Sequence, residues 1–372
     1  MDFLFPYLKW NNKLMLKIIN LITNNYFLKQ KLQVPLFEKP IRRLTDTWRG
    51  NTQKGRRILD EMHTTSNISN FHNFLFLRDL RAEGSLKSRS TARTFVNNWI
   101  EEKHNLVSKI YDATVISSRI IVWSFCYTWF AESGERNFQK KLLNSIAFQA
   151  KYLELKLEKS IDSLERIIII KGIIIAKSIL YEEIKNISIL IELIDIELQF
   201  LINKDGGHVT RSPVLQIQLL RHLIEIRSVI AVLKNIDTKN LHTCTIKMGE
   251  FCRSFQMPNE NLAWFNGGSI VSKDLIKQTL NRIGYKNKIF HIAEETGFCR
   301  ISNQDIVLMA DIGTKKNLKK QNKAGLFSFE FYYKKQKIIS NLGDVINSST
   351  INAHNSLASS AAHSTLSIDD RN

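Results

Sequence analysis

The sequence predicts an α+β protein in which a long helical part comes first and an antiparallel sheet part follows. Three observations lead to this class. No proline occurs between Ile41 and Ser212, and the apolar residues of that stretch recur at three- and four-residue steps. From about residue 280 the apolar residues alternate with polar ones instead. Helices followed by strands, without alternating βα units, indicate two segregated parts.

The helical part divides into segments of similar length, each bounded by a polar or glycine-containing break. Helices are expected over 86–103, 106–131, 135–159, 161–180 and 182–203. After a junction, the residues from Leu215 to Ile230 continue the helical spacing, and one more helix is expected before Ser254. Consecutive helices with short connections form antiparallel pairs, which build a bundle, a solenoid or a closed ring. Periodicity alone leaves these three open.

The run IIIIKGIIIAKSIL, from Ile167 to Leu180, is apolar enough to raise the question of a membrane span. Lys171 and Lys177 lie inside it, and it is well short of the ~20 residues that a span requires. We therefore expect a buried helix. Lysines also interrupt the apolar residues after Met1, and no small-residue cleavage site follows, so no signal peptide is expected.

The sheet part shows period-two patterning. In GLFSFEFYY, Phe327, Phe329 and Phe331 alternate with Ser328 and Glu330. This alternation places three aromatic residues on one face of a strand and polar residues on the other. Further strands are expected over DIVLMADIG and over Ser364–Asp370.

The composition is basic but the basic residues are scattered. Lysine and arginine number 53 against 35 aspartate and glutamate residues, which gives a net charge of +18. Such an excess suits a polyanionic partner, whether nucleic acid, an acidic polysaccharide or an anionic membrane. Lysine, isoleucine and asparagine are abundant everywhere, so we attribute most of the overall composition to a coding bias. The run Lys315–Lys323 is expected to be a solvated loop.

The cysteines form no CxxC pair and show no zinc-ligand spacing: Cys126, Cys244, Cys252 and Cys299.

One junction between two helical segments concentrates turn-forming and polar residues. The Asp205–Gly207 segment supplies a tight turn, and Ser212–Pro213 supplies a capping hydroxyl and a proline for the first helical position. Neither feature requires the imidazole of His208 or the guanidinium of Arg211. From the residues alone, this pair fits an exposed loop better than a functional pair, since loops are polar in general.

The same junction resembles a segment of a known family. DGGHVTRSP, from Asp205 to Pro213, is followed by an amphipathic helix. It is similar to the DGG…ExSPxYH segment of the heparinase II/III-like family of polysaccharide lyases. Five further pieces resemble segments of this family in the same order: FHNFLFLRDLRAEG (71–84), LAWFNGG (262–268), TGFCRI (296–301), AGLFSFEF (324–331) and AAHSTLSIDD (361–370). The resemblance covers about residues 40–372 and is closest to the alphaproteobacterial branch.

This resemblance implies an incomplete (α/α) toroid followed by a partial antiparallel β-sandwich, with a carbohydrate-binding cleft between them. The corresponding domains are an N-terminal helical extension over 1–35, the toroid over 36–278 and a heparinase II/III-like C-terminal domain over 279–372. The last range is shorter than the ~100 to 150 residues of an ordinary domain, so a C-terminally truncated domain is expected. The change of periodicity near residue 280 agrees with this division independently.

The chemistry that the resemblance implies is β-elimination on a uronic acid. The proton on the carbon beside the carboxylate is barely acidic, so the site must first neutralise the carboxylate with hydrogen-bond donors or a cation. A base then removes that proton and an acid protonates the departing glycosidic oxygen, and each transfer is worth ~10²- to 10⁴-fold in rate.

Four residues are candidates for these roles. Arg211 and Asn266 are expected to neutralise the carboxylate, because a guanidinium matches it with two hydrogen bonds and an amide donates without a charge. His208 is the expected base in the helical part. His363 occupies the place of a histidine that faces the cleft in relatives and in some of them helps to bind zinc.

These residues also have ordinary alternatives. Asn266 would only cap the turn of FNGG, and His363 would be a sheet histidine whose hydrogen bonds are satisfied. Tyr285 and Tyr127 are further phenols without an assigned place, and Tyr127 fits the core of a helix.

The chain departs from the family pattern at several positions. Where relatives have the Glu, Tyr and second His of ExSPxYH, this chain has Thr210, Leu215 and Gln216. Gln321–Ala324 stands in place of an HxHA pair, and Asn341 stands in place of the Asp of DPG. Of three zinc ligands only one histidine remains, and one imidazole does not hold the ion. We therefore expect no zinc and no other cofactor.

The leading hypothesis is a carbon–oxygen lyase that degrades an acidic, uronic acid-containing polysaccharide of the heparin or heparan kind. Two alternatives stay open. The first is a glycan-binding protein of the same fold that has lost catalysis, and the second is a helical-repeat scaffold that binds nucleic acid or protein. Because the basic residues are scattered, no nucleic-acid partner is expected, and no integral membrane span is expected either. The resemblance implies a place in the cell envelope or periplasm, although no signal peptide is visible.

Overall fold

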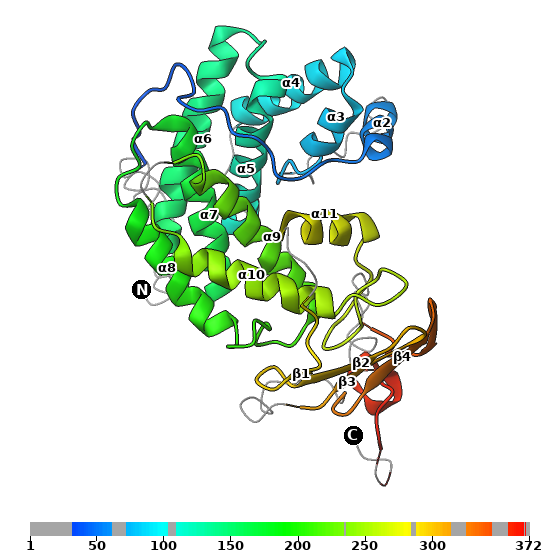
Figure 1. The fold of residues 1–372 in the computed structure, drawn as a ribbon. Coiled ribbons are helices and arrows are strands. Elements are labelled where there is room, and N and C mark those ends of the chain that lie inside the picture. The colour runs from blue at the N-terminus through cyan, green and yellow to red at the C-terminus, as the bar shows by residue number, and fades with distance from the viewer. Residues whose placement is uncertain are drawn as a thin grey trace, which may run out of the picture. The chain divides into compact units, whose positions relative to one another are not determined.

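A computed structural model of the 372-residue chain describes residues 32–61, 72–102, 109–233, 236–283, 288–313, 325–343, 356–367 and 369. Most of the expected extension over 1–35 lies outside these residues, as do Tyr285 and the run 315–323. In Figure 1 the ribbon runs from blue and green helices into orange strands, so helices come first and strands second, as predicted.

The chain forms two compact units. The first comprises Met1–Leu44, Gly50–Lys159 and Ile175–Glu182, and the second comprises Thr45–Arg49, Ser160–Ile174 and Glu183–Asn372. The domain boundaries expected from the family stay a prediction, because these units follow contact density within the chain and not family domains.

The first unit is helical. It contains α2 (Thr52–Glu61), α3 (Leu77–Glu83), α4 (Leu86–Glu101), the 3₁₀ turn Lys109–Tyr111, α5 (Ala113–Phe130) and α6 (Arg136–Leu157). Helix α3 packs on α2, α4 and α5, and α6 packs on α4 and α5. Helix α5 is buried almost all round, and Tyr127 is 1% exposed with its hydroxyl 3.1 Å from Gln139 Oε1. Tyr127 therefore belongs to the core of the helical unit, which was the alternative to a functional role given from the sequence.

The second unit contains the rest of the helices. Helix α7 (Ser163–Leu180) contributes its first part to this unit, and α8 (Ile187–Leu201), α9 (Pro213–Ile230), α10 (Lys239–Ser254) and α11 (Lys273–Ile283) follow. Helix α9 packs against α10 and α11, and α10 packs against α8 and α11. The expected helices agree with α4 to α10 within a few residues at most ends. Helices α2, α3 and α11 were not predicted because they are short, and tertiary packing stabilises such helices more than local propensity does.

The apolar run of α7 is a buried helix, as predicted. Lys171 is 4% exposed, and its Nζ lies 2.5 Å from Glu225 Oε2 and 2.7 Å from His222 Nδ1. Lys177 Nζ lies 2.7 Å from Glu154 Oε1. Both lysines of the run are thus ion-paired within the protein. Over the residues described, the length and apolarity needed to cross a membrane are not combined in any helix.

A five-stranded antiparallel sheet completes the second unit. Its strands follow the chain order as a meander: β1 (Ile292–Ala293), β2 (Phe298–Ser302), β3 (Ile306–Asp311), β4 (Phe329–Tyr333) and β5 (Gln336–Ile339). The register pairs Arg300 with Met309 and Met309 with Glu330, so these three side chains share one face. This face is buried, and Phe298 on it packs edge to face on Phe255 at 4.9 Å.

Strand β4 buries the face that carries its polar residues. Ser328 is 1% exposed and Glu330 is fully buried, whereas Phe327 is 62% exposed. Alternation in the sequence fixes which residues share a face but not which face is covered. The buried carboxylate is tolerated because Glu330 Oε1 accepts hydrogen bonds from the Trp264 backbone, Lys337 and Ser340.

The expected strand over Ser364–Asp370 is wrong for the described residues of that segment. A 3₁₀ turn, Ser360–Ala362, is followed by irregular backbone. The Ser364 hydroxyl bonds to the backbone N–H and C=O of Phe329 in β4. The Ser364 side chain thus makes the hydrogen bonds to β4 that the backbone of a neighbouring strand would have made. The alternation of apolar residues could not distinguish these two arrangements.

Candidate functional site

The junction after α8 folds into a tight turn fastened to the connection between β1 and β2. Gly206 has φ +92°, and the Asn203 N–H donates to Gly207 O at 2.8 Å. Asp205 Oδ1 accepts from the Gly207 N–H at 3.1 Å and from the Thr296 hydroxyl at 2.6 Å, while Oδ2 accepts from the Thr296 N–H at 2.8 Å. Asp205, expected only to form the turn, therefore also ties it to the sheet.

Gly207 is required by a close approach. A Cβ atom on this residue would lie 2.1 Å from Thr296 Oγ1 and 2.6 Å from Phe251 Cζ. We expect Gly207→Ala to lower the free energy of unfolding by about 1 to 3 kcal/mol, since the contact must be relieved by moving packed atoms. Urea unfolding measures this change. Gly134→Ala is a suitable control, because its nearest contact would be 3.1 Å; equal losses in both variants would contradict the explanation.

The start of α9 is held by Gln216 and not by Ser212. Pro213 is the first helical residue, as predicted, but the Ser212 side chain makes no capping hydrogen bond. Gln216 instead accepts the His208 N–H at 2.6 Å and donates to Gly206 O at 2.9 Å and to Met248 O at 3.1 Å. The residue that stands in place of the family's second histidine thus fastens the turn to α9 and α10.

His208 is buried, with 3% of its surface exposed. Burial lowers the pKa of its imidazole from 6.5 to about 4, so the ring is neutral at physiological pH. The Thr210 backbone N–H donates to Nδ1 at 3.2 Å, and the Thr210 hydroxyl lies 2.8 Å from the same atom. Because a backbone N–H can only donate, Nδ1 is the acceptor and the hydrogen of the neutral ring is on Nε2.

The Nε2 atom of His208 has no hydrogen-bond partner in the described part of the chain. A buried N–H without a partner is available to an oxygen of a ligand. In this tautomer Nε2 cannot accept a proton, so His208 fits a hydrogen-bond donor better than the expected base.

The burial of His208 also predicts how stability depends on pH. In the unfolded chain the imidazole binds a proton below pH 6.5, whereas in the folded chain its pKa is about 4. The unfolded state therefore binds more protons as the pH falls below 6.5, and the free energy of unfolding falls with it. Above pH 6.5 both states are neutral and this group contributes nothing. Between pH 7.5 and pH 4.5, the free energy of unfolding of His208→Gln is expected to fall by about 2 kcal/mol less than that of the wild type, as measured by urea unfolding. Parallel losses in the two proteins would contradict the buried neutral ring.

Arg211 is buried and joins the turn to the sheet, so the interpretation of His208 and Arg211 as an exposed loop pair is wrong. Its Nε donates to Thr296 O at 2.7 Å, and Nη2 donates to Gly297 O at 2.9 Å and forms an ion pair with Asp311. Its Nη1 has no partner within the described residues, and its backbone has φ +61°. The carboxylate of Asp311 offsets the positive charge of Arg211. The expected role of Arg211, neutralising a substrate carboxylate, stays a prediction.

Asn266 lies beside Arg211. Its Nδ2 donates to Arg211 O at 3.2 Å, its side chain is half-buried, and its backbone has φ +46°. Two neighbouring non-glycine residues thus adopt the left-handed conformation, which costs free energy and is concentrated at functional sites.

The loop that carries Asn266 rests on Glu330 and Lys337. The Trp264 N–H donates to Glu330 Oε1 at 3.1 Å, and Lys337 Nζ lies 4.0 Å from the centre of the Trp264 ring. Burial raises the pKa of Glu330 above its usual value. Asn341 Nδ2 donates to Trp264 O at 2.8 Å, so the asparagine at the family's Asp position is a structural support of this loop.

His363 comes from the segment after the sheet. Its ring lies near Gly325, on which a Cβ atom would be 3.3 Å from Nδ1. The residue after it, Ser364, donates its N–H to Asn341 Oδ1 at 3.1 Å. The segment is therefore anchored to the residue that also supports Trp264.

The contacts bring His208, Arg211 and Asn266 together in one network. The Arg211 N–H donates to His208 O at 2.8 Å, and Asn266 binds Arg211 O. The link to His363 is indirect, and its convergence with the other three stays a prediction. Residue-level reasoning missed Thr296, Asp311 and Glu330. The alternation of Val307, Met309 and Asp311 was the available signal, because it places a carboxylate in register with buried apolar residues.

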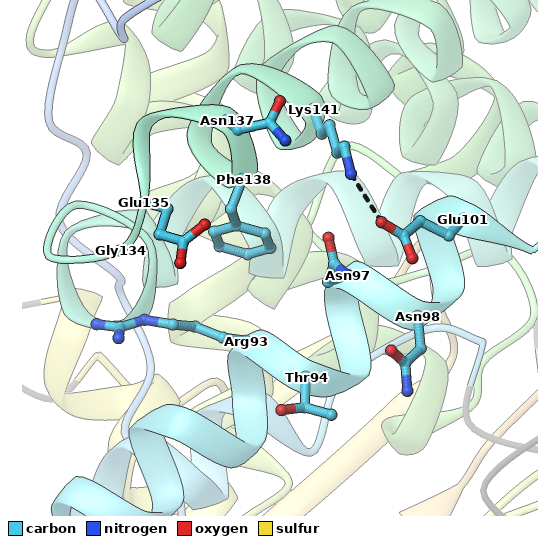
Figure 2. A pocket seen from close by; sticks show the side chains of 10 residues that line it. All are labelled: Arg93, Thr94, Asn97, Asn98, Glu101, Gly134, Glu135, Asn137, Phe138 and Lys141. Atoms are coloured by element: carbon cyan, nitrogen blue, oxygen red, sulfur yellow. Dashed lines mark hydrogen bonds and ion pairs between the residues drawn. The ribbon is translucent and has the colours of Figure 1, made fainter.

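Each compact unit also carries a hollow on its surface. The hollow of the first unit, of about 460 Å³, lies between α4 and α6, and Figure 2 shows Phe138 between the two helices. Its cations are already bound: Lys141 Nζ points to Glu101 Oε1 at 2.7 Å, and Arg93 Nε donates to Phe130 O at 2.5 Å. The hollow of the second unit, of about 310 Å³, lies between α8 and α10.

Comparisons with known proteins agree with this fold. The family model described as Heparinase II/III-like, C-terminal matches residues 286–372. A search of curated protein sequences gave no match. A heparan sulfate lyase from Pedobacter heparinus is similar in structure with a TM-score of 0.62 and 14% identity, over 94% of this chain and 65% of its own.

Two further solved structures are similar to this chain. A structure of heparinase III has a TM-score of 0.67 and 15% identity over 94% of this chain and 67% of its own. A heparinase III gene product has a TM-score of 0.63 and 14% identity over 98% of this chain and 69% of its own. The chain spans less than two thirds of the heparan sulfate lyase. The resemblance found in the motifs and the predicted fold class are both confirmed.

Proposed function

We propose that this protein is a polysaccharide lyase that cleaves an acidic, uronic acid-containing polysaccharide of the heparin or heparan kind by β-elimination. The observation that carries the proposal is the buried neutral imidazole of His208. Its Nε2, which has no partner in the described residues, belongs to the same network as Arg211 and Asn266, in a chain whose fold is similar to those of a heparan sulfate lyase and of heparinase III.

The roles in this proposal follow from the contacts. His208 Nε2–H and the Asn266 amide donate to the uronate carboxylate, and fixed donors of this kind stabilise the negative charge that develops beside it. Arg211 positions the turn against β2 and β3 through Thr296, Gly297 and Asp311. His363 acts as the base from the sheet part.

The reaction needs no oxidant or further reactant. The base accepts the proton from the carbon beside the carboxylate, and the electron pair of that C–H bond forms a carbon–carbon double bond. The bond from the next carbon to the glycosidic oxygen breaks, and that oxygen takes up a proton.

The test is the appearance of an unsaturated uronate. The full chain is incubated with heparin, heparan sulfate and other acidic polysaccharides, and absorbance in the near ultraviolet is followed. New absorbance with at least one uronic acid-containing glycan is the expected result. A protein that stays folded and yields no absorbance with any of them contradicts lyase activity.

A second candidate, a glycan-binding protein without catalysis, is favoured by the residues at the family's departures. Gln216 and Asn341 are buried, and the hydrogen bonds of their side chains are directed to the backbone of neighbouring segments. Neither is arranged to move a proton. Binding of an acidic glycan without new absorbance would support this candidate.

We also propose, together with the lyase function, that the protein acts in the cell envelope or periplasm.

A further inference from the structure

The hollow between α8 and α10 gathers three lysines whose ammonium groups have no partner among the residues that the structure describes. Lys204, Lys239 and Lys247 line it together with Asn240, Thr243 and Asp195, and these residues define the α8–α10 hollow. Its volume of about 310 Å³ is at the lower end of the ~300 to 1,000 Å³ of small-molecule sites. It can therefore hold a group of the size of one or two sugar rings.

The lysines come from two walls of the hollow. Lys239, Thr243 and Lys247 are four residues apart along α10, so they share one face over about 12 Å of helix. Lys204 comes from the turn after α8, beside Asn203, whose side chain donates to Thr296 Oγ1 at 3.1 Å. The positive charge is thus held by two separate elements of the same unit.

Within the described residues, no hydrogen bond or ion pair engages the Nζ atom of Lys204, Lys239 or Lys247. By contrast, in the hollow between α4 and α6, Lys141 is paired with Glu101, as Figure 2 shows, and Arg93 donates to the Phe130 carbonyl. Like charges held near one another repel, and a bound anion removes that repulsion.

Two carboxylates beside the hollow already have partners. Asp237, which precedes α10, accepts from the Lys239 backbone N–H at 2.9 Å, so the positive end of this helix is occupied by a carboxylate of the protein. The carboxylate of the hollow, Asp195, accepts from Asn240 Nδ2 at 3.2 Å. Burial and the nearby carboxylates of Asp237 and Glu192 raise the pKa of Asp195.

We propose that the α8–α10 hollow binds a sulfate- or carboxylate-bearing segment of an acidic glycan, as a second binding site on the protein. The inference rests on the proposed function, since the ligand is the same class of polysaccharide. The amide of Asn240 and the hydroxyl of Thr243 add the neutral donors that sugar hydroxyls require.

The hollow also adjoins the turn that carries His208. A Cβ atom on Gly206 would lie 2.7 Å from Lys247 O, so the turn packs directly on α10 at this lysine. A long glycan held in the hollow is therefore retained beside the turn, whereas a short one is not able to occupy both places.

The experiment compares two triple variants with equal changes of charge. In one, Lys204, Lys239 and Lys247 are replaced by Gln. In the control, three exposed lysines remote in sequence, Lys54, Lys159 and Lys335, are replaced by Gln. Binding of full-length heparin is measured at several salt concentrations, and urea unfolding shows whether each variant is folded.

We expect the hollow variant to bind heparin roughly tenfold more weakly and with a shallower salt dependence, because three ion pairs are removed. The control is expected to change less than about twofold. Equal weakening of both variants, or no weakening of either, overturns the proposal. Duplex DNA that displaces heparin at equal salt and lower concentration also overturns it, since the ligand would then be a nucleic acid.

Cleavage provides a separate readout. The hollow variant is expected to cleave a tetrasaccharide, followed by near-ultraviolet absorbance, at the wild-type rate. If the wild type cleaves nothing but heparin binding depends on the three lysines, the proposed lyase activity fails and the second site stands. If the tetrasaccharide is cleaved and heparin binding is unchanged by the three substitutions, the second binding site is contradicted and the proposed lyase activity is not.

Discussion

Replacing His208 with alanine is expected to lower kcat/KM for an acidic glycan by about 10²- to 10³-fold, whereas His208→Gln is expected to keep a substantial part of the activity. The difference follows from the hydrogen on Nε2: glutamine also ends in an N–H donor, and alanine has none. Initial rates of near-ultraviolet absorbance measure both variants.

A base at this position would behave differently. Glutamine cannot accept a proton, so equal losses in His208→Ala and His208→Gln would return His208 to the role of base. The pH profile provides an independent check, because burial lowers the pKa of His208 to about 4. The wild-type and His208→Gln enzymes are therefore expected to show the same acid limb between pH 5 and pH 7. Unfolding by urea at pH 7.5 shows that the variants are folded.

The largest expected effect on stability belongs to Arg211. We expect Arg211→Ala to lower the free energy of unfolding by about 3 to 5 kcal/mol, because it leaves Asp311 buried without its cation and removes the donors to Thr296 O and Gly297 O. Urea unfolding at pH 7.5 measures the loss.

Two comparisons separate the ion pair from its surroundings. Lys204→Ala changes an exposed cation in the same turn and is expected to alter stability by less than about 0.5 kcal/mol. The double variant Arg211→Met with Asp311→Leu is expected to be more stable than either single variant, since no uncompensated charge stays buried. If Arg211→Ala costs less than about 1 kcal/mol, the guanidinium does not fasten the turn to the sheet.

Local signals were sufficient for the helices but not for the orientation of the sheet. The helical spacing around Leu219, Leu223 and Ile226 predicted α9 because a helix repeats its apolar face every three to four residues. The alternation in β4 identified two faces correctly. It could not show that Ser328 and Glu330 lie on the covered face, because that depends on Trp264 and Lys337 from other segments.

The candidate site shows the same division at the level of single residues. Composition of the junction singled out His208 and Arg211, since no turn or cap requires an imidazole and a guanidinium. The burial of both residues, the partner carboxylate of Asp311 and the tautomer of His208 depend on strands almost a hundred residues further along the chain or on backbone geometry within the turn.

The sequence by itself determined the order of helices and strands, the turn at Gly206 and the candidate residues of the junction, because each depends on backbone preferences and side-chain spacing within a few residues. Only the tertiary structure decided that Arg211 is paired with Asp311, that His208 is a neutral donor and that three lysines share a hollow. These properties arise from burial and from charges that packing brings together. Both depend on residues that are distant in the sequence, so neither can be derived from neighbouring residues alone.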